Sequence, residues 1–546
     1  MKKKIGILLL LSLFALTALY GCSGGNKEDG GSTNSANENS LSEGQNGESS
    51  SDMTADADEP VYGGSVIVGI TQDLDSLDPH KAVAAGTNEV LYNIFEGLVK
   101  PDKDGNLVPA VASEYTISED GMTYTFTLRD DVLFHNGSLV TADDVIYSIK
   151  RSAGMLETSD PEVKVESALS VISEINSSVT EEGKTQIVIS LSEPNTELIG
   201  YLTTPIIPKD YDGQAGAPVG TGPFKFVSYT PLQSFIMEKN EDYYVEDVPY
   251  LDQVTFKISA NTDSAFMELM AGAIDIFPYL TEEQANQLSS TYDIEVGNMN
   301  LVQGLFLNNQ AAPFDNILVR QALCYAIDRQ GILDMVAGGK GNIIGSNMFH
   351  GFSIYYDETL ENVYPYNIDK AKELLAEAGY ADGFSFTIKV PSNYQFHVDT
   401  AQVIVEQLKA VGIDAKIQLI EWASWLSDVY KGRDYEATIV GLDAKLAPSD
   451  VLKRYRSDAS NNFLNYKNPE FDAIFAEAVG TIDQDVKIEK YRELQALLTN
   501  DAASVYIQDP SLLVAVNKKL TGYTFYPVYV QDMSVVAYTG TPENHQ

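Results

Sequence analysis

The sequence predicts an α/β protein, and the order of helices, glycines and strands in its second half is the main evidence. Twice in that half, an amphipathic helix ends at a glycine and a β-rich segment follows. The first half mixes strand-like and helix-like segments without an internal repeat. Segment 504–538 is again β-rich and aromatic, which indicates that the chain returns to the first part of the fold. Alternation of this kind is typical of α/β proteins.

Four segments of the first half have clear local signals. Residues 65–70 form a short β-rich run, and residues 123–128 alternate large apolar side chains with threonine, as half-buried strands do. Residues 87–98 place their apolar side chains on one helical face. Thr141 and Asp144 have the spacing of a capping box, so we expect a helix to begin there.

The repeated unit of the second half has defined ends. The predicted segments are helix 369–378, Gly379 and strand 384–390, followed by helix 400–411, Gly412 and strand 415–420. Two more helices are expected over 471–479 and 486–498. Gly379 and Gly412 are the expected helix stops, because glycine tolerates the left-handed conformation that ends many helices.

The N-terminus has the layout of a lipoprotein signal. Three lysines precede an apolar run over 5–20, which is too short for a bilayer span of about 20 residues. Leu19-Tyr20-Gly21-Cys22 resembles a bacterial lipobox, in which cleavage precedes a cysteine that becomes acylated. We predict a signal peptide over 1–21, lipidation of Cys22, and anchoring to the outer face of the cytoplasmic membrane, at a Gram-positive cell surface or in a periplasm.

Composition separates a tether from a folded body. Residues 22–60 are rich in Ser, Gly, Asn, Asp and Glu and have very few large apolar side chains, so we expect them to stay unfolded. The other cysteine, Cys324, lies in an apolar run and leaves no disulfide framework. The whole chain is 44% hydrophobic, which allows a large core, and its formal charge of −42 opposes binding to nucleic acid.

Motifs for catalysis or cofactor binding are absent from the sequence. The five histidines lie far from one another and from the cysteines, so we predict no metal site. Gly220-Thr221-Gly222 begins like a dinucleotide loop, but Pro223 and Lys225 break that pattern, which favours a tight turn where two chain segments cross. No carboxylate pair is singled out for glycoside hydrolysis. We expect no cofactor and no enzyme activity.

A series of short motifs follows one order over about 63–538. They include Asp78-Pro79-His80, Phe95-Glu96-Gly97-Leu98, Phe134-His135-Asn136-Gly137, Val219-Gly220-Thr221-Gly222-Pro223-Phe224, Pro313-Phe314-Asp315 and Ala326-Ile327-Asp328-Arg329. In these motifs the chain resembles the extracellular solute-binding proteins of family 5. That family includes oligopeptide-, dipeptide- and nickel-chelate-binding components of ABC importers.

The resemblance implies a two-lobed fold of the large periplasmic-binding-protein type II class, cluster C, with a hinge between the lobes. Lobe I would comprise 61–300 and 515–546, with an extra subdomain inserted at about 101–219, and lobe II would comprise 301–514. Binding would shift the population toward a closed form that holds the ligand between the lobes. The implied partners are a membrane permease and ATPase subunits, and the protein is expected to be a monomer.

Asp443 and Lys445 determine which ligand class the resemblance implies. In peptide-binding relatives, an aspartate of the corresponding segment binds the α-ammonium group, and aligning Gly441 and Pro448 puts Lys445 at that position. One buried ammonium group repels another. Either Asp443 binds the amine from two residues away, or Lys445 binds a carboxylate or another anion. A solvated loop lysine is the third interpretation.

Four aromatic or imidazole side chains complete the candidate site in lobe II. Tyr394 and His397 lie in the loop where dipeptide binders have an arginine, and they could donate hydrogen bonds or pack. Trp422 and Trp425 could form an apolar wall of the cleft or pack in the core.

In lobe I, residues 84–88, among them Thr87 and Asn88, correspond to positions that line the cleft in relatives. The leading hypothesis is capture of oligopeptides or peptide-like solutes, because main-chain groups of a cleft can pair with any peptide. A metal chelate, a carbohydrate or an anionic metabolite is the alternative ligand. A ligand-sensing surface protein is the alternative role.

Overall fold

The structure is a computed structural model that describes residues 59–157, 160–392 and 394–545. The predicted signal peptide, Cys22 and nearly all of the predicted tether lie outside the described residues. In the described part of the chain, no helix is long and apolar enough to cross a membrane.

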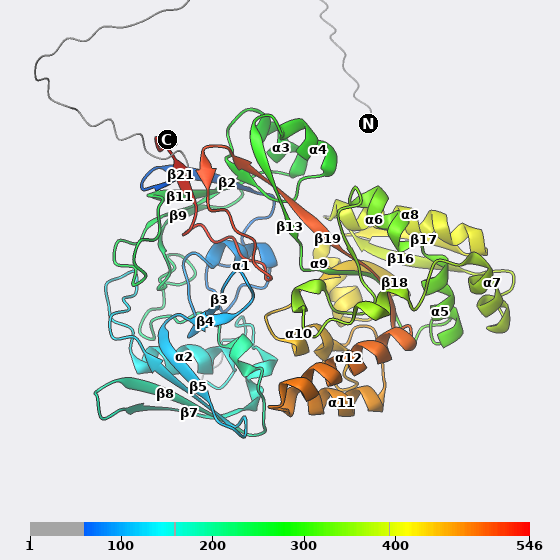
Figure 1. Ribbon diagram of the computed structural model, residues 1–546, viewed down its shortest axis with the longest axis horizontal. Coiled ribbons are helices and arrows are strands. Elements are labelled where there is room, and N and C mark those ends of the chain that lie inside the picture. The colour runs from blue at the N-terminus through cyan, green and yellow to red at the C-terminus, as the bar shows by residue number, and fades with distance from the viewer. Residues whose placement is uncertain (1–58, 158–159, 393, 546) are drawn as a thin grey trace, which may run out of the picture. The chain divides into compact units, whose positions relative to one another are not determined.

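A mixed sheet of twelve strands is the centre of the fold (Figure 1). Its order is β17 (Asp414–Ile420), β16 (Ser385–Pro391), β18 (Ala437–Leu442), β14 (Val302–Leu307), β19 (Ser504–Asn517), β12 (Ile276–Phe277), β2 (Ser65–Ile70), β11 (Gln253–Ile258), β10 (Ser234–Lys239) and β9 (Phe224–Thr230), while β13 (Tyr292–Asn298) and β15 (Gly341–Ile343) also pair with β19. The predicted strands at 65–70, 384–390 and 415–420 are thereby confirmed within one residue.

The long strand β19 links the two halves of this sheet. Residues 504–508 pair with β14, and residues 511–517 pair with β13 on the other half. Figure 1 shows β19 running from β13 toward β18. After β19, a small sheet joins β20 (Leu520–Thr521), β21 (Ala537–Thr539) and β1 (Pro60–Val61). The predicted return of the tail to the first part of the fold is therefore confirmed.

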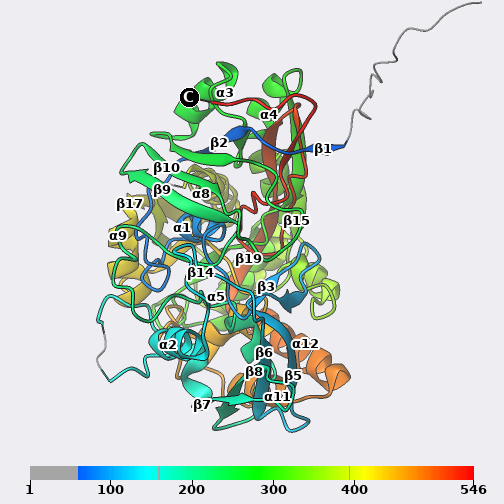
Figure 2. The ribbon, with the colours of Figure 1, turned by 90° about the vertical axis from the view of Figure 1, so that its left-hand side faces the viewer.

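A separate four-stranded sheet, which we call the small sheet, lies within the segment expected as an inserted subdomain. Its order is β5 (Ala112–Ile117), β6 (Thr123–Leu128), β8 (Thr185–Leu191) and β7 (Ile172–Val179), and β3 (Val99–Pro101) pairs with β4 (Leu107–Pro109) beside it. Tyr124, Phe126, Val145 and Ile149 are buried in one core between this sheet and α2 (Ala142–Ser152). Figure 2 shows the sheet and α2 from the side.

The helices pack around the large sheet, except that α2 packs against the small sheet. They are α1 (Ala85–Leu91), α2 (Ala142–Ser152), α3 (Thr262–Met270), α4 (Glu282–Leu288), α5 (Ile317–Ala326), α6 (Arg329–Val336), α7 (Ile368–Glu377), α8 (Gln395–Leu408), α9 (Trp422–Ser424), α10 (Pro448–Leu452), α11 (Pro469–Gly480) and α12 (Gln484–Asn500). The capping box of Thr141 and Asp144 is confirmed at the start of α2. Gly379 and Gly412 follow their helices with φ of 89° and 80°, as predicted.

Two predicted helix ends were wrong. The helix expected over 87–98 is α1, which ends at Leu91, because the carbonyl groups of Asn93 and Ile94 accept hydrogen bonds from Phe224 and Gly222 instead of continuing the helix. The helix expected to begin at Thr400 is α8, which begins at Gln395. Thr400 lies inside that helix, and its hydroxyl donates to the Phe396 carbonyl one turn earlier.

The turn over 220–222 is the predicted chain crossing. A Cβ atom added to Gly220 would lie 2.1 Å from the Ile94 carbonyl oxygen, and one added to Gly222 would lie 2.6 Å from that of Asn93. Only glycine fits where two backbones approach so closely. The crossing fixes the chain that follows α1 against β9.

Candidate ligand-binding site

The loop after β18, residues 443–450, which we call the clamp loop, brings the first site residue into place. Asp443 is exposed, yet burial by the surrounding protein raises the pKa of its carboxyl group. From an exposed side chain whose carboxyl group is nonetheless desolvated, we infer that Asp443 lies in a recess. Asp443 makes no ion pair within the described residues.

Glu89 on α1 faces the same recess from the N-terminal half of the chain. Its side chain is 5% exposed and accepts a hydrogen bond of 2.7 Å from the Tyr279 hydroxyl. Burial raises the pKa of Glu89 to about 7, and the negative charge of Asp443 contributes to the rise. Two carboxyl groups from distant parts of the chain therefore act on each other. A cation bound near these two carboxyl groups would therefore be stabilised by both of them.

Tyr529 lies among these carboxyl groups. Burial raises the pKa of its hydroxyl, and the charges of Asp443, Glu89 and Asp509 raise it further. Asp509 is fully buried in β19, where one carboxylate oxygen accepts the Leu301 N–H at 3.0 Å and burial raises its pKa to about 7. The acidic recess therefore adjoins the strand that links the two halves of the large sheet.

Thr87 and Asn88, predicted from the resemblance, directly precede Glu89 on α1. The Thr87 side chain is buried and its hydroxyl oxygen accepts the Asp75 N–H at 3.1 Å, which fixes the loop before α1. Asn88 is exposed. The role of Thr87 and Asn88 at the ligand stays a prediction, and the residue of this helix whose charge acts on Asp443 is Glu89.

Lys445 contacts residues of the segment that carries the small sheet. Its ammonium group lies 3.4 Å from the Glu166 carboxylate and 5.4 Å from the centre of the Tyr201 ring. Lys453 lies 3.6 Å from the same carboxylate and forms a second ion pair with Asp450. Although burial opposes it, these two ammonium groups lower the pKa of Glu166. We call Glu166, Tyr201, Lys445, Asp450 and Lys453 the Glu166 cluster.

Further contacts hold the clamp loop to the same region. The Ser449 N–H donates to the Glu197 carboxylate at 3.0 Å, and the Tyr201 hydroxyl donates to Asp450 at 3.2 Å. Glu197 also accepts from the Tyr491 hydroxyl and lies 3.7 Å from the Lys487 ammonium group. The clamp loop is therefore held by its second half, while Asp443 at its start forms no ion pair with any residue that the structure describes.

His397 supports the clamp loop from inside the core. It is 7% exposed, and burial lowers its pKa to about 4, so the ring is neutral. The Gly441 N–H donates to its Nε2 atom at 3.0 Å, and the Gln303 amide lies 2.9 Å from its Nδ1 atom. Both ring nitrogens are thereby engaged, and His397 fixes the backbone two residues before Asp443.

The two tryptophans have different surroundings. They stack with ring centres 5.0 Å apart, but Trp425 is 2% exposed and its indole N–H donates to the Thr438 hydroxyl at 2.9 Å. Trp422 is half-buried and meets the half-buried Tyr394 edge to face at 5.5 Å. Trp422 and Tyr394 can therefore offer aromatic surface, whereas Trp425 supports Trp422 from the core.

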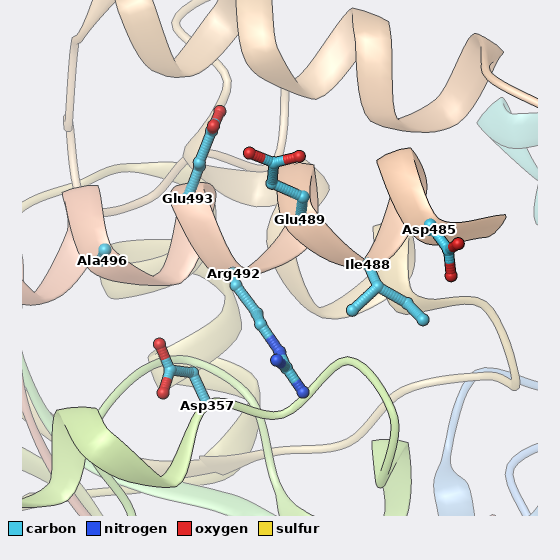
Figure 3. Close-up of a pocket in the computed structure, with 7 residues that line it drawn as sticks. All are labelled: Asp357, Asp485, Ile488, Glu489, Arg492, Glu493 and Ala496. Carbon is cyan, nitrogen blue, oxygen red and sulfur yellow. The ribbon is translucent and has the colours of Figure 1, made fainter. Parts of the chain in front are cut away.

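A groove of about 470 Å³ lies elsewhere, on the outer face of α12 (Figure 3). It is lined by Asp357, Asp485, Ile488, Glu489, Arg492, Glu493 and Ala496. The side chains point in different directions and do not converge on one point (Figure 3). No predicted site residue lines it. Across the described ranges, no group of three or more His, Cys, Asp or Glu side chains could hold a metal ion.

Comparison with known proteins identifies the family of this chain. Residues 106–463 match the family model of bacterial extracellular solute-binding proteins, family 5 Middle. The oligopeptide-binding protein AppA of Bacillus subtilis is 26% identical over 96% of this chain and 97% of its own length. The glutathione-binding protein GsiB of Salmonella paratyphi A is 29% identical over 85% of this chain and 92% of its own.

A solved structure shows the same fold. The ABC transporter-associated periplasmic binding protein DppA from Helicobacter pylori, in complex with the peptide STSA, is 27% identical, with a TM-score of 0.78 over 88% of this chain and 99% of that chain. The fold is that of a cluster C solute-binding protein, so the predicted fold class is confirmed.

The chain belongs to family 5 of the bacterial extracellular solute-binding proteins. It is a substrate-binding protein of an ABC transporter, and the prediction of a binding protein in place of an enzyme is confirmed by the family.

Proposed function

We propose that this protein captures a peptide or peptide-like solute by its ammonium group and delivers it to a membrane permease driven by ATPase subunits. The observation that carries the proposal is Asp443: its carboxylate is exposed in a recess, desolvated and unpaired within the described residues. A charged ligand ammonium would supply the missing partner at short range, where hydrogen bonds between charged groups are strongest. Relatives named for oligopeptide and glutathione binding support this ligand class.

The hypothesis that Lys445 binds an anionic ligand is not supported by its contacts. Its ammonium group already has an ion pair with Glu166 and a position over the Tyr201 ring. A ligand anion would have to displace that carboxylate. Of the two alternatives, the shift of the amine-binding role to Asp443 is the one we propose.

We further propose that the lobes predicted as 61–300 with 515–546 and 301–514 close on the ligand, with β19 as part of the hinge. The pairing of β19 with strands of both halves supports this role. Glu89 and Asp443, one from each proposed lobe, would both face the bound ammonium group. Attachment through Cys22 remains part of the proposal, and radiolabelled palmitate incorporation that is lost in Cys22→Ala would test it.

Thermal unfolding against a panel of peptides tests the proposed function. Ligand at a hundred times its Kd stabilises a protein by about 2.7 kcal/mol, which a melting curve resolves. We expect a rise with free-amine peptides and none with their N-acetylated forms. Asp443→Asn should abolish the rise, while Asp414→Asn, an exposed aspartate on β17, should keep it. A rise that survives acetylation, or one given only by sugars or metal chelates, would contradict the proposal.

A further inference from the structure

The loop over 194–201, in the segment that carries the small sheet, contacts proposed lobe II through its backbone. The Thr196 N–H donates to the Val479 carbonyl at 3.3 Å, across the boundary between the proposed lobes. A Cβ atom added to Gly200 would lie 3.1 Å from the Leu446 carbonyl oxygen of the clamp loop. Backbones approach each other this closely where a glycine leaves room. The two proposed lobes are therefore in direct contact here, in addition to their link through β19.

Glu197 is the charged centre of this contact. Its side chain is 6% exposed, and three groups of proposed lobe II surround its carboxylate. The Ser449 N–H donates to it at 3.0 Å, the Tyr491 hydroxyl donates to it, and the Lys487 ammonium group lies 3.7 Å away. A buried carboxylate is stable when such partners compensate its charge. Because these partners all come from proposed lobe II, separation of the lobes would remove them and return the carboxylate to water.

Glu166 makes a second charged contact of the same kind. Its side chain is 15% exposed, and its carboxylate lies 3.4 Å from the Lys445 ammonium group and 3.6 Å from that of Lys453. The clamp loop also contributes an apolar group, since Ala447 is 1% exposed and belongs to the apolar core of the small sheet. Two carboxylates and an apolar core, all in proposed lobe I, thus hold one loop of proposed lobe II.

The segment that carries the small sheet is attached to the rest of proposed lobe I by contacts of its own. Arg151 forms two parallel hydrogen bonds with the Asp78 carboxylate, at 2.9 and 2.7 Å, and the His80 ring lies 2.9 Å from the Pro205 carbonyl. These groups all belong to proposed lobe I, so they stay together when the lobes separate. The contacts of Glu166 and Glu197 are the ones that separation would break.

We propose that Glu166 and Glu197 form a latch between the proposed lobes, which fixes the clamp loop, and with it Asp443, in the closed form. This inference rests on the proposed movement of the lobes but not on the identity of the ligand. The cations of the latch are lysines of the chain itself, so it closes without any charge from the ligand. A ligand that binds Asp443 in the closed form is then retained by the latch as well as by its own contacts.

Hydrogen exchange of the ligand-free full chain, read residue by residue by mass spectrometry, tests the latch. Two successive amides report different events. The Thr196 N–H bonds to Val479 in the other proposed lobe, whereas the Asn195 N–H donates to the Gly121 carbonyl at 3.2 Å within the same segment. Opening of the lobes exposes the Thr196 amide and leaves the Asn195 amide protected, because exchange follows the opening of the unit that each bond closes.

Glu166→Gln is the informative variant, since Thr196 is bonded to other residues and any effect on it must come through the lobes. In the closed form both lysines lose an ionic partner, while in the open form water solvates them. We expect exchange at Thr196 to become about 10-fold faster and exchange at Asn195 to stay unchanged. Glu162→Gln is the matched control, because Glu162 pairs with Lys81 at 2.8 Å within proposed lobe I, and it should change neither amide.

Three results would overturn the latch. Faster exchange at Ser449 alone would mean that Glu166 steadies the clamp loop only locally. Equal acceleration at Thr196 and Asn195 would mean that the segment unfolds, and unchanged exchange at Thr196 would mean that Glu166 does not hold the lobes. These measurements use no ligand, so each of the three results leaves the proposed peptide capture standing. A peptide panel without any melting shift would contradict that capture and leave the latch standing.

Discussion

The two ends of the clamp loop differ in how their charges are paired. At its start, Asp443 is exposed, desolvated and unpaired within the described residues. Two residues later, Lys445 belongs to the Glu166 cluster, and the loop ends in backbone and side-chain contacts with Glu197 and Tyr201. Both residues are charged, so charge alone does not identify a residue that binds the ligand. What distinguishes Asp443 is a charge that the chain leaves without a partner.

The largest effect is expected where the loop is held most firmly. Glu197→Gln should lower the free energy of unfolding by about 3–5 kcal/mol, because it leaves the ammonium group of Lys487, which is 5% exposed, without its ionic partner. Urea unfolding measures the loss. Glu193→Gln, an exposed glutamate nearby, is the control and should change stability by less than about 0.5 kcal/mol. Equal effects of the two variants would show that Glu197 does not anchor the loop.

In the acidic recess, removal of the Glu89 charge should have the opposite effect and raise the free energy of unfolding of the ligand-free protein. The pKa of Glu89 is about 7 in the folded protein against an ordinary value of 4.5, so the folded state holds this proton more tightly than the unfolded state. Stability therefore falls between pH 4.5 and 7 as Glu89 ionises. Glu89→Gln should stabilise the ligand-free protein at pH 8, by up to about 3 kcal/mol, with a gain that shrinks toward pH 5.

Unfolding curves at pH 5, 6, 7 and 8 measure this gain. Glu114→Gln, on the exposed edge of the small sheet, is the control and should give no such trend. A gain in Glu89→Gln that is equal at all four values would mean that Glu89 does not ionise near pH 7. A bound ammonium ligand should also reduce the gain, because it stabilises the ionised Glu89.

Smaller effects should separate the two lysines of the Glu166 cluster. Lys453→Met removes two ion pairs of a side chain that is 23% exposed and should cost about 1–2 kcal/mol, whereas Lys445→Met removes one pair of a side chain that is 39% exposed and should cost less than about 1 kcal/mol. Thermal unfolding at low and high salt measures both. A larger loss of stability in Lys445→Met than in Lys453→Met would mean that Lys445, and not Lys453, contributes more to the Glu166 cluster.

The sequence was sufficient for the regular parts of the fold. Glycine stops at Gly379 and Gly412, the capping box at Thr141 and the chain crossing at Gly220 are set by neighbours close in sequence or by the absence of a side chain. Helix ends were less predictable: α1 ends where carbonyl groups bond to a segment about 130 residues later, which no local pattern shows.

The site could be predicted only in part. Asp443 was singled out by resemblance and stays a prediction, while Glu89 and Glu166 were not singled out, since the chain has 78 acidic residues and no spacing distinguishes these two. Their roles depend on which charges are paired, and Glu166 lies far in sequence from its partners Lys445 and Lys453. The sequence suggested that Lys445 could bind an anion, because its ionic partner, Glu166, cannot be recognised from sequence alone.

The central claim is that Asp443 binds the ligand while Lys445 only holds the clamp loop. The most direct measurement is calorimetric titration of Asp443→Asn and Lys445→Met with the peptide that gives the largest melting shift in the panel. We expect Asp443→Asn to lower affinity by about 100-fold or more and Lys445→Met to change it by less than about 3-fold. Equal losses in both variants, or a loss confined to Lys445→Met, would contradict the account.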